Sequence, residues 1–171
     1  KVDYSPIDGN IIDLARFGEL GSKGVLALMA DSTNAEREGC TRSERTVGES
    51  FDRLFKKAEG RRIIIATFSS NIHRVQQIIN AAEHYGRKVA VSGRSMINVI
   101  NTAIELGYLE VPDGLIVDID MMNRYENERM VLITTGSQGE PMSALTRMAM
   151  NDHRKVNITP MDFIIISATP I

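Results

Sequence analysis

Three short polar segments follow apolar runs of the sequence and hold the residues best suited to bind an anion. They consist of Ser69, Ser70 and Asn71, of Gly93, Arg94 and Ser95, and of Gly136, Ser137, Gln138, Gly139 and Glu140. Small residues at the start of a helix leave backbone N–H groups free for an anion, and the helix dipole favours negative charge there. These segments therefore predict phosphate binding. The alternatives are a solvated loop around Arg94 and a simple tight turn at 136–140.

Two further residues, His73 and Asp31, are candidates for catalysis. His73 lies early in a predicted helix beside Arg74, a further candidate phosphate ligand, where a group that donates a proton near neutral pH is useful. The alternative is an imidazole that bonds a neighbouring turn or faces solvent. Asp31 ends a predicted strand, where its carboxylate could orient a metal-bound histidine. Its alternative role is an Asx turn into Ser32 and Thr33.

The sequence predicts neither a metal centre nor a nucleotide cofactor within this chain. Its three histidines, His73, His84 and His153, are far apart and lack the spacings that gather metal ligands. The segment 136–140 lacks the Lys-Ser/Thr pair of a P-loop, and it lacks the Gly-x-Gly-x-x-Gly spacing of dinucleotide-binding loops.

Strand, turn and helix units position the polar segments. Continuous apolar runs predict strands at 63–67, 88–91, 115–117, 130–133 and 163–166. Apolar residues at helical spacing predict helices that begin near Ile72, Met96 and Pro141. Strands of this kind alternating with helices are typical of an α/β sandwich with a mainly parallel sheet. In such a sheet all three turns lie outside the carboxyl ends of the strands, where ligands bind.

The first 60 residues are organised differently. The apolar run 25–29 predicts a buried strand, and Asp13 is expected to cap a short helix over 14–20. Thr41 and Glu44 have the spacing of a capping box, which predicts that the next helix opens there.

Composition excludes several classes of protein. The 171 residues carry 20 Lys and Arg against 22 Asp and Glu, so the chain is not a basic-tail nucleic-acid binder. No apolar run approaches the ~18 residues of a membrane span, so no membrane partner is expected. The single Cys40 fits a reducing compartment, and we expect a cytoplasmic protein. The chain begins at Lys1 without a signal-peptide pattern, which suggests a piece of a longer protein.

Five motifs, in their order and spacing, resemble the bacterial ribonuclease J family, which combines a metallo-β-lactamase fold with an inserted β-CASP domain. The motifs are Asp-Ser-Thr-Asn at 31–34, Ser-Glu-Arg at 43–45, Ala-Thr-Phe-Ser-Ser-Asn-Ile-His-Arg at 66–74, Gly-Arg-Ser at 93–95 and Thr-Gly-Ser-Gln-Gly-Glu-Pro at 135–141. The resemblance implies that 1–42 end a first metallo-β-lactamase segment. Residues 43–171 would then form a β-CASP domain, incomplete at its C-terminus, with a Rossmann-like three-layer sandwich.

The resemblance also implies roles for single residues and a cofactor. Asp31 matches the acid of the family's β-CASP motif A, and His73 matches its motif B histidine. The family's His-x-His-x-Asp-His zinc-ligand cluster would lie before Lys1, and the last ligand histidine after Ile171. The parent protein would use two zinc ions, whereas this chain alone would hold none and be inactive.

The implied activity is hydrolysis of RNA phosphodiester bonds, both internally and from the 5′ end, in RNA processing and decay. The parent would be a homo-oligomer that binds single-stranded RNA, and this chain would form one wall of the RNA cleft. Two alternatives stay open: a stand-alone, non-catalytic RNA-binding module, and a small Rossmann-like enzyme acting on a phosphorylated metabolite. Neither accounts for all five motifs.

Overall fold

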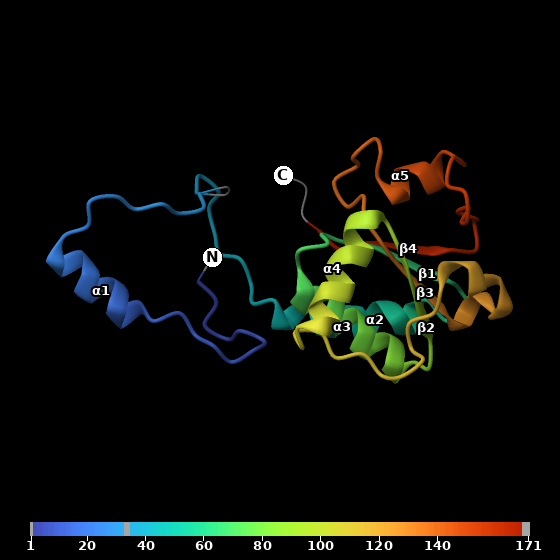
Figure 1. Ribbon diagram of the computed structural model, residues 1–171, viewed down its shortest axis with the longest axis horizontal. Helices are drawn as coiled ribbons and strands as arrows, with labels where there is room; N and C mark the ends of the chain where they lie inside the picture. The colour runs from blue at the N-terminus through green and yellow to red at the C-terminus, as the bar shows by residue number, and fades with distance from the viewer. Residues whose placement is uncertain (1, 33–34, 169–171) are drawn as a thin grey trace. The chain divides into compact units, whose positions relative to one another are not determined.

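The computed structural model describes residues 2–32 and 35–168. The chain divides into two compact units, Lys1–Val47 and Gly48–Ile171. Its helices are α1 (Leu14–Lys23), α2 (Arg45–Lys57), α3 (Ile72–His84), α4 (Arg94–Glu105) and α5 (Ala144–Ala149), with the 3-10 helices η1 (Ile119–Arg124) and η2 (Asn127–Arg129). Its strands are β1 (Ile63–Ala66), β2 (Lys88–Ser92), β3 (Met130–Thr134) and β4 (Phe163–Ile166) (Figure 1).

The second unit is built on a four-stranded sheet in the order β2-β3-β1-β4. All its neighbouring strands are parallel, and Ile64 of β1 lies opposite Leu132 of β3 and Ile164 of β4. The predicted parallel α/β sheet is therefore confirmed, with the predicted runs that begin at residues 63, 88, 130 and 163 as its strands. The predicted strand 115–117 is only a single bridge, in which Val89 donates to the Leu115 carbonyl at 2.9 Å and accepts from Val117 at 2.8 Å.

Helical layers cover the two faces of the sheet. One face packs against α5 and η1 in a buried cluster that contains Ile64, Ala90, Met122, Met130, Leu132, Ala144, Met148 and Val156. Successive strand residues point to opposite faces, so Ile63, Ile65, Val131 and Ile133 face the other way. Helices α3 and α4 pack against β2 and bury Val75, Ile79, Met96 and Ile100. The result is the three-layer sandwich expected from the sequence.

The start of α2 differs from the predicted capping box. Thr41 lies outside the helix, which begins at Arg45. The Asp3 carboxylate accepts from the Ser43 hydroxyl at 2.9 Å and from the Glu44 N–H at 3.2 Å. The helix start is thus capped by Asp3, 41 positions from Glu44, together with the Ser43 hydroxyl, which accepts from the Arg45 N–H at 3.3 Å. Spacing within the helix could not reveal the contact with Asp3.

The predicted buried strand 25–29 is wrong for this structure. The segment is irregular, and Leu26 and Met29 are almost fully exposed, at 105% and 96%. A strand needs a hydrogen-bonded neighbour, and no strand of the described residues pairs with this segment. Helix α1 is confirmed with Asp13 as its cap, since the Asp13 carboxylate accepts from the Arg16 N–H at 2.8 Å. It runs to Lys23 and so exceeds the predicted range.

Among the described residues, no helix combines the length and apolar character that a membrane crossing requires.

Candidate functional site

The structure brings the turns that follow β1, β2 and β3 to one edge of the sheet, here called the carboxyl edge. Strand β3 lies between β2 and β1, so its turn is central. The N–H of Thr67 donates to the Thr134 carbonyl at 3.1 Å. Gly93 lies so close to Thr135 that a Cβ at residue 93 would be 2.9 Å from the threonine Oγ1. The three polar segments therefore form one continuous surface.

The turn 93–95 is the best anion site of the three. Gly93 precedes α4, and no side chain caps this helix. The first N–H groups of a helix lack acceptors within the helix, so they remain free for a ligand. Arg94 and Ser95 are exposed, and their side chains make no hydrogen bond with the described residues. A guanidinium, a hydroxyl and a helix N-terminus thus meet at one point, a combination suited to phosphate.

The turn 69–71 offers less free hydrogen-bonding capacity. The Asn71 side chain accepts from the Arg74 N–H at 3.1 Å and thereby caps α3. The Arg74 guanidinium donates to the Ser167 carbonyl at 2.7 Å, which ties α3 to the end of β4. Ser70 is exposed and Ser69 is half-buried. Asn71 and Arg74 are therefore engaged in holding the edge together, whereas Ser70 faces solvent.

The turn 136–140 does not open a helix, contrary to the prediction for Pro141. Helix α5 begins at Ala144, and the Ser143 side chain caps it. The start of α5 is held next to the end of β3, because the Leu145 N–H donates to the carbonyl of Thr135, the residue after β3, at 3.1 Å. The argument from the helix dipole therefore does not apply to this turn. The turn is closed internally, because the Glu140 carboxylate accepts from the Gln138 N–H at 3.1 Å.

A glycine is required at residue 136, and we expect Gly136→Ala to lower the free energy of unfolding by about 2 kcal/mol or more. Gly136 has a φ of +110°, and a Cβ there would lie 2.4 Å from the Ser143 Oγ and 2.8 Å from the Leu145 Cβ. Gly139 is the matched control, because its φ is +77° but nothing lies within 4 Å of its Cβ position. Denaturant unfolding of both variants measures the difference; equal losses would contradict the close approach at 136.

The two candidate catalytic residues lie in different units of the chain. His73 is exposed at the start of α3 and borders an apolar groove of about 410 Å³ between α3 and α4. The groove is further lined by Ile72, Asn98, Val99, Thr102, Ala103, Leu106 and Tyr108. Asp31 is exposed in the first unit, and its predicted turn partner Thr33 lies outside the described residues. The structure thus places His73 at the carboxyl edge of the second unit, whereas Asp31 belongs to the first unit.

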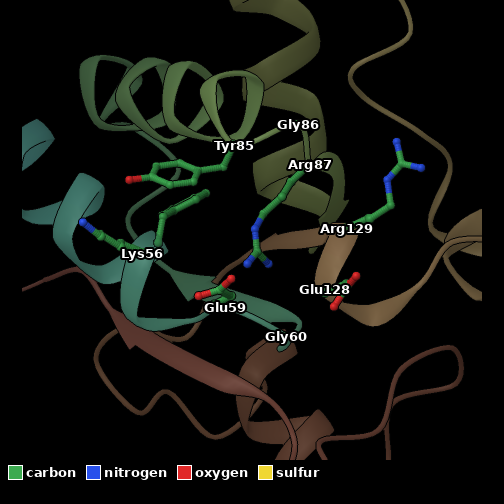
Figure 2. A pocket seen from close by; sticks show the side chains of 9 residues that line it. Lys56, Glu59, Gly60, Tyr85, Gly86, Arg87, Glu128 and Arg129 are labelled. Atoms are coloured by element: carbon green, nitrogen blue, oxygen red, sulfur yellow. The ribbon is translucent and has the colours of Figure 1, made fainter.

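A pocket of about 680 Å³ lies at the opposite, amino ends of the strands. Figure 2 shows the Arg87 side chain directed into this pocket, with Glu59 and Glu128 beside it. Arg87 donates to the carbonyls of Arg61 and Ala58 at 2.7 and 3.0 Å. Burial lowers the pKa of Arg87, and Glu128 opposes this shift. Because its charges alternate in sign, the pocket does not resemble a groove for a polyanion.

Sequence reasoning missed the role of His153, which it considered as a metal ligand. The His153 Nε2 and the Ser92 Oγ are 3.0 Å apart. This contact joins the loop after α5 to the last residue of β2, directly before the turn 93–95. No spacing signal links residues 61 positions apart, so only the structure could find it.

The described residues do not fit a zinc centre. No group of three or more His, Cys, Asp or Glu side chains that could hold a metal ion occurs in residues 2–32 and 35–168. His73, His84 and His153 lie at the start of α3, at its end and in the loop after α5.

Comparisons with known proteins decide the family of the chain. The family model described as the β-CASP domain of ribonuclease J matches residues 60–171. The chain belongs to the ribonuclease J family. Ribonuclease J of Synechocystis sp. is 46% identical over 171 residues, and that of Helicobacter pylori strain J99 is 47% identical over 171 residues. Ribonuclease J2 of Bacillus subtilis is 44% identical over 172 residues.

Each of these matches covers the whole chain but only part of the relative. The chain spans 27% of the Synechocystis protein, 25% of the Helicobacter pylori protein and 31% of the Bacillus subtilis protein. The second compact unit therefore carries the β-CASP fold of a ribonuclease J. The domain boundary expected between residues 42 and 43 stays a prediction.

Proposed function

We propose that this chain forms the RNA-binding side of a ribonuclease J and holds the sugar-phosphate backbone of single-stranded RNA at its carboxyl edge. The observation that carries this proposal is the uncapped N-terminus of α4, with Arg94 and Ser95 exposed beside it. Contacts of this kind position a strand without reading its bases. They suit a nuclease that acts on many RNA sequences. Membership of the ribonuclease J family favours RNA over a phosphorylated metabolite.

We further propose that the full-length protein hydrolyses RNA internally and from the 5′ end, in RNA processing and decay in the cytoplasm, as a homo-oligomer. The exposed thiol of Cys40 supports a reducing compartment. Two zinc ions would polarise the scissile phosphodiester when bound. The described residues of this chain do not fit them, so their ligands would come from other parts of the protein. By itself, the chain is expected to be inactive.

Replacing Arg94 tests the proposed phosphate contact. In the full-length protein, Arg94→Ala is expected to weaken binding of hydrolysis-resistant single-stranded RNA about tenfold, because a charge-assisted hydrogen bond is lost. The loss should be similar for all RNA sequences, and the slope of log affinity against log salt should shrink by about 0.7. Fluorescence anisotropy over a salt series measures both quantities.

Arg129 provides the matched control, because it is an exposed arginine that lines the pocket at the opposite ends of the strands. Arg129→Ala should leave affinity and salt slope unchanged. Equal effects of the two variants would mean that RNA affinity depends only on the net charge of the protein, and the proposed function would then fail.

Replacing Asp31 separates a charged role from a turn-forming one. Asp31→Asn in the full-length protein keeps the shape of an Asx turn but removes the charge. If the charge supports a metal-bound histidine, zinc content or cleavage rate should fall about 10- to 100-fold at an unchanged melting temperature. We expect this outcome. A stable variant with full zinc content and unimpaired cleavage would leave Asp31 as a turn residue.

A further inference from the structure

The loop after α5 is attached to the sheet through the imidazole of His153. His153 is half-buried, and its two ring nitrogens have different partners. Nδ1 accepts from the backbone N–H of Val156 at 3.1 Å and from that of Lys155 at 3.3 Å. Nε2 lies 3.0 Å from the hydroxyl oxygen of Ser92, which is buried at the end of β2. One side chain therefore closes its own loop and ties that loop to a strand.

These partners define the protonation state of His153. Backbone N–H groups only donate, so Nδ1 must carry a lone pair and the ring proton must be on Nε2. Nε2–H consequently donates to the Ser92 oxygen. This arrangement also excludes a nucleophilic serine, because a general base would need its lone pair on Nε2. The contact is structural, and only a neutral imidazole can make all of it.

The environment of His153 supports the neutral form. Burial lowers the pKa of His153, and the positive charges of Arg147 and Lys155 lower it further, while Asp152 raises it. Lys155 is itself paired with Asp120 of η1 at 2.7 Å, and β2 contributes only the uncharged Ser92 to this contact. Arg147 of α5 bonds Asp152 through its Nε at 3.2 Å. Protonation of Nδ1 would place a third donor against the two backbone N–H groups.

The hydrogen bond between His153 and Ser92 lies directly before the candidate RNA-binding turn. Ser92 is followed directly by Gly93, Arg94 and Ser95, and Gly93 packs on Thr135 of the central turn. We propose that neutral His153 is a positioning residue for the 93–95 turn, and that protonation of Nδ1 in acid breaks its contacts with the loop, displaces the imidazole from Ser92 and weakens RNA binding there. This inference rests on the proposed binding of RNA phosphate at the same turn.

The direction of the pH effect follows from the lowered pKa of His153. The tie is complete above the ordinary histidine pKa of about 6.5 and is lost as the pH falls through the lower value of the folded protein. The net free energy of one such hydrogen bond corresponds to a change of about threefold to tenfold in an equilibrium constant. RNA affinity of the full-length protein should fall by this factor as the pH falls from about 7.5 through the lowered pKa of His153.

Two measurements on the full-length protein test the inference. Nitrogen NMR of labelled histidines should show the Nε2–H tautomer of His153 at neutral pH, and a titration of His153 below the ordinary histidine pKa of about 6.5. Fluorescence anisotropy with hydrolysis-resistant single-stranded RNA should show the acid-induced loss of affinity in the wild type.

In His153→Asn an oxygen replaces Nδ1 as the acceptor for the loop, but the shorter side chain cannot reach Ser92 and does not titrate. This variant should bind RNA about threefold to tenfold more weakly already at neutral pH, without the acid-induced loss.

His84→Asn is the control, because His84 is an exposed histidine at the C-terminal end of α3. It should keep the wild-type pH profile. An Nδ1–H tautomer, or a wild-type profile in His153→Asn, would overturn the inference. Unchanged RNA binding in Arg94→Ala would instead overturn the proposed function. The tautomer of His153 and its titration are measured without RNA, so the two failures can be distinguished.

Discussion

Asp162→Ala is expected to lower the free energy of unfolding by about 3 to 5 kcal/mol, because it leaves a buried guanidinium without its carboxylate. Arg62, just before β1, donates from Nε and Nη2 to the two oxygens of Asp162, both at 2.7 Å. The side chains are 12% and 1% exposed. Asp162 also accepts from the N–H of Thr159 at 2.7 Å, so its removal opens the turn before β4.

The pair between Lys155 and Asp120 is the control for this prediction. Its N–O distance is also 2.7 Å, but the side chains are 45% and 62% exposed. Solvent screens such a pair, so Asp120→Ala should cost less than about 1 kcal/mol. Chemical denaturation of the two variants provides the comparison. If Asp162→Ala is as mild as Asp120→Ala, water reaches the Arg62 pair and the pair does not hold β4 to β1.

The fold of the second unit could be predicted because its two central strands, β1 and β3, are buried on both faces. Ile63–Ala66 and Met130–Thr134 are buried at every position, so each reads as an unbroken apolar run. Helix α3 also follows from local rules, since Asn71 caps it and Val75, Ile79 and Ala82 recur at helical spacing. Local chemistry and tertiary packing agree at these positions.

Contacts between distant residues account for what the sequence could not predict. Asp3 moves the start of α2 past Thr41, and the return of the chain to Thr135 keeps Pro141 out of α5. The segment 25–29 has the composition of a strand but pairs with no described strand. In each case the deciding partner is far away in the sequence, where periodicity and capping rules carry no information.

The same distinction applies to the carboxyl edge. Parallel topology alone predicted that the three polar segments would meet there. It could not rank them, because the ranking depends on hydrogen bonds within the edge. The Asn71 side chain is occupied in capping α3, and the turn 136–140 does not lead into a helix. The side chains of Arg94 and Ser95 make no hydrogen bond within residues 2–32 and 35–168, so they can bind a ligand.

His73→Ala in the full-length protein is expected to lower the turnover of RNA cleavage about 100-fold or more and to leave stability unchanged. A group that donates to a developing phosphate charge contributes this much in other enzymes. Stability should not change, because the His73 side chain is exposed and makes no hydrogen bond with the described residues. Its position at the start of α3 places it at the edge where the proposed RNA backbone lies.

Two further variants make this expectation specific. His73→Gln keeps a hydrogen-bond donor but cannot carry a proton, so it should restore RNA affinity without restoring turnover if proton donation is the role. His84→Ala removes an exposed histidine from the other end of the same helix and should cleave RNA at the wild-type rate. Single-turnover cleavage, RNA affinity and melting temperature distinguish these outcomes. A folded His73→Ala protein with near wild-type cleavage would mean that this imidazole only faces solvent beside the apolar groove between α3 and α4.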